Sequence, residues 1–72
     1  MSLWSQDYES FRLKLKEARQ AVHLTQTEAA QKLKKPQSYI AKCESGERRV
    51  DIMELQKFAR IYKKKVDYFL ED

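Results

Sequence analysis

Glycine and proline are nearly absent from this 72-residue sequence, which contains one of each. Because turn-rich sheets and disordered tails draw heavily on these two residues, their scarcity argues against both kinds of chain. The sequence instead combines 42% hydrophobic with 36% charged residues, a composition typical of a compact helical protein. A chain of this length can enclose one modest hydrophobic core. We therefore expect a single all-α domain that spans residues 1–72.

Residues for metal, redox or catalytic chemistry are equally scarce. Cys43 is the only cysteine and His23 the only histidine, so no intramolecular disulfide can form and neither a metal nor a cofactor is predicted. Cys43 lies on the predicted inner face of a helix, where it should pack as a small hydrophobic residue. No carboxylate pair or activated nucleophile gathers on one predicted surface. We therefore do not expect an enzyme.

Long apolar runs are missing too, and the first residues have neither the basic start nor the hydrophobic stretch of a secretory signal. We therefore expect a protein that is neither exported nor membrane-spanning. The single free cysteine fits the reducing environment of a cytoplasm.

The net charge of +4 is concentrated in one stretch of the sequence, residues 32–49. The residues before and after this stretch carry balanced charge. Within it the basic residues are Lys32, Lys34, Lys35, Lys42, Arg48 and Arg49. They face only two acidic residues, Glu44 and Glu47. A local excess of positive charge indicates an anionic partner.

Apolar residues recur at helical spacing through most of the chain. The first such series predicts a helix over about residues 6–22, with Tyr8, Phe11, Leu15, Ala18 and Val22 on its buried side. Trp4 and Phe11 are interpreted as core or dimer contacts. A later series predicts a helix over about residues 52–62, with Ile52, Leu55, Phe58, Ala59 and Tyr62 on its buried side. A last short buried turn is expected from Val66, Phe69 and Leu70.

Capping signals place the remaining helix boundaries. Thr25 followed three residues later by Glu28 forms a capping box, so a second helix should begin there. Asp51 followed three residues later by Glu54 repeats this signal before the helix expected over about residues 52–62. The segment Lys34-Lys35-Pro36 ends that helix and begins the next, because proline suits the start of a helix and not its interior. Gly46 then supplies the left-handed residue that ends a third helix at about residue 45.

Residues 25–46 therefore have the layout of a helix-turn-helix, with residues 37–44 as its recognition helix. Gln37, Ser38 and Lys42 lie on the outward face of this helix. Glutamine can bond bidentately to adenine, lysine can donate to guanine, and serine can bond a base or a phosphate. We predict that these three residues contact bases, although the same residues also suit a plain solvated face.

Hydrogen-bond donors surround the third helix and could bind DNA phosphates. The predicted phosphate contacts are Gln26, Lys34, Lys35, Tyr39, Arg48 and Arg49. Gln26 lies in the first turn of the second helix, where the helix dipole favours an anion. Two alternatives stay open for Tyr39, whose ring could pack in the core or whose hydroxyl could reach a phosphate.

Three stretches, LKEAR at 15–19, TQTEAAQKL at 25–33 and PQSYIAKCESG at 36–46, resemble the Cro and phage-repressor type of helix-turn-helix, the XRE family. The similarity extends over about residues 11–70. It implies a compact five-helix, lambda-repressor-like domain in which Gln26 contacts a phosphate and the exposed early residues of the third helix read bases. It also implies a structural ion pair between Arg19 and Glu44.

Two residues depart from the family pattern. Lys34 stands where the turn usually contains glycine, which implies a strained or slightly different turn because a side chain disfavours positive φ. Ala29 stands where a larger aliphatic residue is usual, which implies a thinner core.

The sequence thus predicts a transcriptional regulator that binds double-stranded DNA as a homodimer on a two-fold symmetric operator. The resemblance implies a prokaryotic or phage protein that is located in the cytoplasm and associated with the nucleoid. The alternative is a protein-interaction module, such as an antitoxin, whose main partner is another protein.

Overall fold

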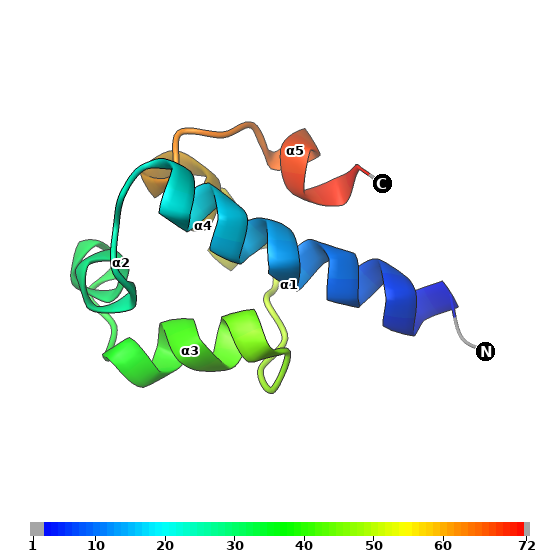
Figure 1. Cartoon of the computed structure of the whole chain (residues 1–72), viewed down its shortest axis with the longest axis horizontal. Helices are drawn as coiled ribbons and strands as arrows, with labels where there is room; N and C mark the ends of the chain where they lie inside the picture. The colour runs from blue at the N-terminus through cyan, green and yellow to red at the C-terminus, as the bar shows by residue number, and fades with distance from the viewer. Residues whose placement is uncertain (1–2, 72) are drawn as a thin grey trace.

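The computed structural model describes the backbone of residues 3–71 and the side chains of residues 8–71. This part of the chain forms α1 (Leu3–Ala21), α2 (Gln26–Leu33), α3 (Gln37–Ser45), α4 (Ile52–Ile61) and α5 (Val66–Leu70) (Figure 1). The first helix begins three residues before its predicted start, and the other boundaries agree with the predictions within one residue. Trp4, expected to be a core or dimer contact, lies outside the described side chains.

The starts of α2 and α4 are both fixed by the predicted capping boxes. At α2 the Glu28 N–H donates to Thr25 Oγ1 at 3.0 Å, and the Thr25 N–H donates to Glu28 Oε1 at 2.8 Å. At α4 the Glu54 N–H donates to Asp51 Oδ1 at 2.8 Å, and the Asp51 N–H donates to Glu54 Oε1 at 2.9 Å. Each box satisfies two backbone donors that the helix itself leaves free.

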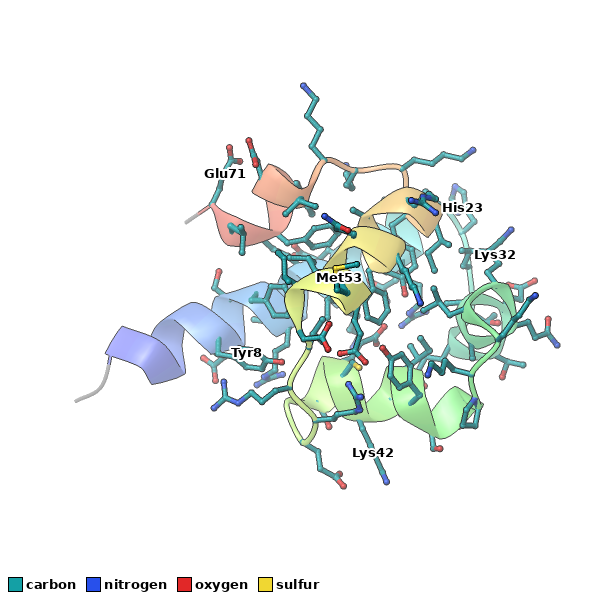
Figure 2. All side chains as sticks on the ribbon, turned by 180° about the vertical axis from the view of Figure 1, so that it is seen from behind. Tyr8, His23, Lys32, Lys42, Met53 and Glu71 are labelled. Atoms are coloured by element: carbon teal, nitrogen blue, oxygen red, sulfur yellow. The ribbon has the colours of Figure 1, made fainter. Side chains whose placement is uncertain are left out.

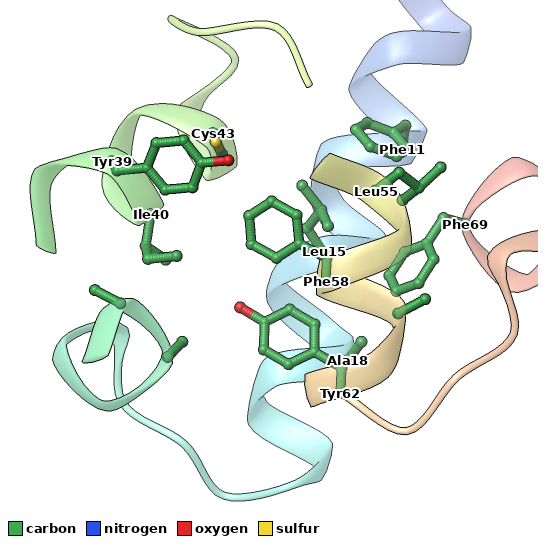
Figure 3. Close-up of a cluster of buried hydrophobic side chains, with 13 residues drawn as sticks. Phe11, Leu15, Ala18, Tyr39, Ile40, Cys43, Leu55, Phe58, Tyr62 and Phe69 are labelled. Atoms are coloured by element: carbon green, nitrogen blue, oxygen red, sulfur yellow. The ribbon is translucent and has the colours of Figure 1, made fainter. Parts of the chain in front are cut away.

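The long helix α1 crosses the molecule, with α3 on one side of it and α5 on the other (Figure 1). Side chains from all five helices meet in one buried cluster (Figure 3). Its members are Phe11, Leu15, Ala18, Ala29, Ala30, Tyr39, Ile40, Cys43, Leu55, Phe58, Ala59, Tyr62 and Phe69. The prediction that Cys43 packs as a buried hydrophobic residue is confirmed, because none of its surface is exposed.

Two residues predicted on buried faces are exposed instead. Ile52 is 58% exposed and Leu70 is 63% exposed. Ile52 is the first residue of α4, and its side chain borders an open hollow that is also lined by Phe11 and Leu70. The helix α5 has only five residues, and it uses Phe69 to cover the core while Leu70 faces outward. Helical spacing predicted their positions on the helices but not how far the neighbouring helices cover them.

Three residues other than glycine have left-handed backbone angles. They are His23, Lys34 and Lys63, with φ of 61°, 58° and 59°. Each follows the end of a helix, where glycine is the usual residue because a Cβ atom is strained at positive φ. The expected strain at Lys34 is therefore present, and the same strain occurs at two further helix ends.

We predict that Lys63→Gly raises the free energy of unfolding by up to about 1 kcal/mol, since it relieves a left-handed residue with a Cβ atom. Urea unfolding followed by circular dichroism measures this change. Lys65→Gly is the matched control, because Lys65 has φ of −77° and glycine relieves no strain there. A Lys63→Gly variant that is no more stable than the unmodified protein would contradict the prediction.

Candidate nucleic-acid interface

The turn between α2 and α3 consists of Lys34, Lys35 and Pro36. The Lys34 N–H donates to the Gln31 carbonyl at 3.1 Å, and the Lys35 N–H donates to the Ala30 carbonyl at 2.9 Å. These bonds close the end of α2 while the left-handed Lys34 changes the chain direction. Pro36, extended with φ of −70° and ψ of 156°, immediately precedes α3. The predicted helix-turn-helix is thus confirmed in its backbone.

One face of α3 is buried and the other is exposed. The buried hydrophobic residues are Tyr39, Ile40 and Cys43. On the other side Gln37, Ser38 and Lys42 are all exposed. Figure 2 shows Lys42 extending away from the remaining helices. The three residues predicted to contact bases therefore lie together on the exposed side of one short helix.

A buried ion pair joins α1 to α3. Arg19 donates from Nε to Glu44 Oε2 at 2.7 Å and from Nη2 to Glu44 Oε1 at 3.1 Å. The side chains are 9% and 6% exposed. The hydrogen bonds to Glu44 raise the pKa of Arg19 above its ordinary value. The remaining nitrogen, Nη1, donates to the Leu24 carbonyl at 2.8 Å and so fixes the chain between α1 and α2. These are the two residues for which the resemblance implies an ion pair.

A chain of side-chain hydrogen bonds runs from this ion pair to the exposed face of α3. Gln26 Nε2 donates to Glu44 Oε1 at 3.1 Å, and Gln37 Nε2 donates to Gln26 Oε1 at 2.6 Å. The sequence placed Gln26 and Gln37 at the starts of two helices without predicting a bond between them. Gln37 keeps its carbonyl oxygen and one amide hydrogen for another partner, which is the pair of groups that recognises adenine.

A second cluster holds the loop after α3 against α4. Arg48 binds the Glu54 carboxylate with nitrogen–oxygen distances of 3.0 Å and 2.9 Å, and the Tyr39 hydroxyl donates to Glu54 Oε2 at 3.0 Å. The hydrogen bonds from Arg48 hold the pKa of Glu54 at about 2. Burial and the bond to Glu54 raise the pKa of Tyr39.

These bonds involve two residues that the sequence predicted as phosphate contacts, Tyr39 and Arg48. The Tyr39 ring stacks parallel to Phe58, with centroids 6.1 Å apart, so the packing alternative describes this residue. Its hydroxyl donates its only proton to Glu54 Oε2. Arg48 is bound to the same carboxylate. Sequence reasoning missed Glu54 as their common partner, because its only local signal was its place in the second capping box.

The other predicted phosphate contacts lie around the ends of α3. Lys34 and Lys35 are exposed in the turn before it. Arg49 is exposed beyond its far end, where the guanidinium carbon lies 4.1 Å from the centre of the Tyr8 ring. Gln26 is half-buried at the start of α2. Exposed positive charge therefore lies at both ends of α3.

Other kinds of site find little support in the described part of the chain. Among the described side chains, those of residues 8–71, no three His, Cys, Asp or Glu residues are grouped as metal ligands. Among the helices of these residues, none combines the length and apolar character needed to span a membrane.

Two short helices joined by a tight turn, with a polar face on the second helix, define a helix-turn-helix domain. A family model described as helix-turn-helix matches residues 15–69. The structure is similar to that of an XRE-family like protein from Pseudomonas syringae pv. tomato str. DC3000. The TM-score is 0.87 and the identity 35%, over 94% of this chain and 83% of that chain. None of the curated proteins compared with the chain matches it.

The chain therefore belongs to the helix-turn-helix family of the Cro and phage-repressor (XRE) type, a family of DNA-binding domains. The predicted fold class, an all-α domain of this family, is confirmed. The prediction that the chain is not an enzyme is confirmed by membership of this non-enzymatic family.

We predict that the free energy of unfolding falls at low pH because Glu54 becomes protonated. Its pKa of about 2 in the folded protein lies below the ordinary value of 4.5, so folding favours the charged form. This stabilisation is fully present above pH 4.5 and is lost as the pH falls towards about 2. Thermal unfolding by circular dichroism across this range should show a shallower decline for Glu54→Gln than for the unmodified protein.

Glu47→Gln is the control for this experiment, since Glu47 is an exposed carboxylate in the loop that contains Arg48. The Glu47→Gln variant should show the same acid dependence as the unmodified protein. An unchanged slope in Glu54→Gln would show that the bonds from Arg48 and Tyr39 do not stabilise the folded state.

Proposed function

We propose that this protein is a sequence-specific transcriptional regulator that inserts α3 into the major groove of double-stranded DNA. Residues 1–72 act as one binding domain. The observation that carries the proposal is the position of Gln37, which is exposed on α3 and held from behind by Gln26. A side chain that is oriented before binding loses less conformational entropy when it meets a base.

The residues proposed to contact bases are Gln37, Ser38 and Lys42. The free carbonyl oxygen and amide hydrogen of Gln37 match the donor and acceptor of adenine. Lys42 lies further along the exposed side of α3 and can donate to guanine, while Ser38 can bond a base or a phosphate. Their shared exposed face supports this assignment.

The residues proposed to contact phosphates are Gln26, Lys34, Lys35 and Arg49. Gln26 keeps one amide hydrogen free, and it lies where the start of α2 attracts an anion. Lys34, Lys35 and Arg49 are exposed around α3 and carry no ion pair in the described part of the chain. We leave Tyr39 and Arg48 out of this set because both are bound to Glu54.

A single domain of this size covers a short stretch of DNA, so one copy alone would bind weakly. We therefore propose that it acts as a homodimer on a two-fold symmetric operator in the cytoplasm. The half-sites should be separated by about one helical turn, roughly 10 bp, or a multiple of it. Selection from random duplexes tests the proposal, which requires enrichment of such a symmetric site. Binding without any enriched sequence would refute it.

We predict that Gln37→Ala and Lys42→Ala each lower the preference for the selected site over random DNA by about tenfold or more. The reason is that each substitution removes a group proposed to meet a base edge, while the proposed phosphate contacts Lys34, Lys35 and Arg49 stay in place. Fluorescence anisotropy with both duplexes measures the ratio. Gln56→Ala on the exposed side of α4 and Lys16→Ala on the exposed side of α1 are the matched controls. Equal losses on both duplexes would contradict the assignment to bases.

We predict a different signature for Lys35→Ala. It should weaken binding to the selected site and to random DNA alike, because a phosphate contact carries no sequence information. The slope of log affinity against log salt should become less steep by about 0.9, the contribution of one neutralised phosphate. Lys16→Ala again serves as the control. An unchanged salt slope in Lys35→Ala would remove this residue from the interface.

A further inference from the structure

A second group of basic side chains lies on the side of α1 that faces away from the recognition helix. In Figure 1, α5 and the loop before it lie on one side of α1, and α3 lies on the other side. We call this group the distal basic patch. It consists of Lys14 on α1, Lys63, Lys64 and Lys65 in the loop between α4 and α5, and the ring of Tyr68 on α5. None of the residues proposed to contact DNA belongs to it.

The ring of Tyr68 brings two of these ammonium groups together. Lys64 Nζ lies 4.6 Å from the centre of the ring, and Lys14 Nζ lies 5.8 Å from it. Both distances are within the range of a cation–π interaction. Lys14, Lys64 and Tyr68 are half-buried, whereas Lys63 and Lys65 are exposed. Residues from two distant parts of the sequence therefore form one patch of positive charge.

The acidic residues that balance this part of the sequence do not neutralise the patch. Asp51 and Glu54 lie at the start of α4, and the loop lysines follow its end. A helix of 10 residues is about 15 Å long, which exceeds the screening length of about 8 Å at physiological ionic strength. Asp67 is exposed on α5. No ion pair of the described side chains includes Asp67 or a lysine of the patch.

The lysines of the patch therefore repel one another, and a bound polyanion would relieve that repulsion. A second segment of DNA fits this requirement best. The chain belongs to a family of DNA-binding domains, so a molecule bound through α3 has the rest of a long DNA molecule at high local concentration. Lysine ammonium groups on a loop bond phosphates and read no bases. Binding at the patch should thus be non-specific and strongly dependent on salt.

We infer that the distal basic patch binds a second DNA segment, so that one molecule holds two duplexes. One duplex lies against α3, and the other lies against the loop between α4 and α5. The contact at the patch is independent of base sequence. This inference goes beyond the proposed function, because a non-specific contact needs no operator.

Co-capture of two duplexes tests the inference. The selected duplex with both half-sites is immobilised and saturated with protein, and a fluorescent random duplex is then added at low salt. The complex should capture the random duplex. Lys63→Ala combined with Lys65→Ala should weaken this capture about fivefold or more. The slope of log affinity against log salt should become less steep by about 1.8, the contribution of two neutralised phosphates.

Lys16→Ala combined with Lys57→Ala is the matched control. Both lysines are exposed, both lie outside the patch and outside the proposed DNA contacts, and their loss removes the same charge. Each double variant should bind the selected duplex through α3 like the unmodified protein, and circular dichroism verifies that each stays folded. The inference is overturned if the complex captures no random duplex, if the patch variant captures it normally, or if the control loses capture equally.

Polyglutamate distinguishes DNA from an acidic segment of another protein, which would meet the same charges. It is added to the co-capture experiment as a competitor, at the same concentration of negative charge as the random duplex. The inference requires that most of the random duplex stays bound. Displacement of most of it would overturn the inference and assign the patch to an acidic protein.

An NMR titration with a random duplex separates this inference from the proposed function, because it uses no selected site. At low salt the ring signals of Tyr68 and the backbone amides of residues 63–65 should change, and the patch variant should reduce these changes. Unchanged signals there would overturn the inference and leave the proposed function intact. A protein that shows these changes but enriches no sequence would refute the proposed function and leave the second surface intact.

Discussion

The buried ion pair between Arg19 and Glu44 connects every part of the DNA-binding unit. Arg19 comes from the end of α1 and Glu44 from the end of α3, and the distance of 2.7 Å between Nε and Oε2 leaves the two helices little freedom to separate. Arg19 also binds the Leu24 carbonyl in the connection to α2. Arg12, about two helical turns earlier in α1, donates to the Glu44 carbonyl at 3.2 Å. Three segments of the chain therefore meet at one carboxylate residue.

The DNA-binding unit depends on the ion pair between Arg19 and Glu44 because an unpaired buried charge is costly. Removal of one partner from such a pair typically costs about 3–5 kcal/mol, because the other charge remains in the protein interior. The whole folding free energy of a small domain is of the same order. The ion pair therefore determines how α3 is held as well as how stable the protein is.

The position of the proposed reading residues follows from the same contact. Glu44 accepts a hydrogen bond from Gln26, and Gln26 accepts one from Gln37, so the exposed amide of α3 is linked to the buried charge through two hydrogen bonds. The apolar face of α3 is meanwhile fixed by Ile40 and Cys43, which are completely buried. A rigid polar face on a firmly packed helix is what sequence-specific contact with bases needs.

Features with a local cause could be predicted from the sequence. The capping boxes at Thr25 and Asp51 depend on residues three apart, and the strained turn at Lys34 follows from a missing glycine. Features that depend on distant residues could not be predicted by spacing. Glu54 lies far from Tyr39 in the sequence, and nothing near either residue signals the hydrogen bond that joins them. The family resemblance predicted the distant pair of Arg19 and Glu44, which periodicity alone did not.

The exposed apolar side chains also show which features could be predicted from local sequence and which could not. Helical periodicity identified Ile52 and Leu70 as apolar members of α4 and α5 but could not show that no other helix covers them. Which surface is left uncovered depends on the relative positions of helices, and short helices provide few neighbours. The hollow beside these two residues, which Tyr8, Phe11 and Leu55 also line, is visible only in the folded chain.

An NMR titration of the isotopically labelled protein with the duplex selected from random DNA tests the central claim most directly. The account predicts that the side-chain amide signals of Gln37 and Gln26, together with the backbone amides of the first turn of α3, change most on binding. Signals of the exposed residues Ile52 and Leu70 on α4 and α5 should change little when a single half-site is used. The largest changes at these two residues, or unchanged signals along α3, would contradict the account.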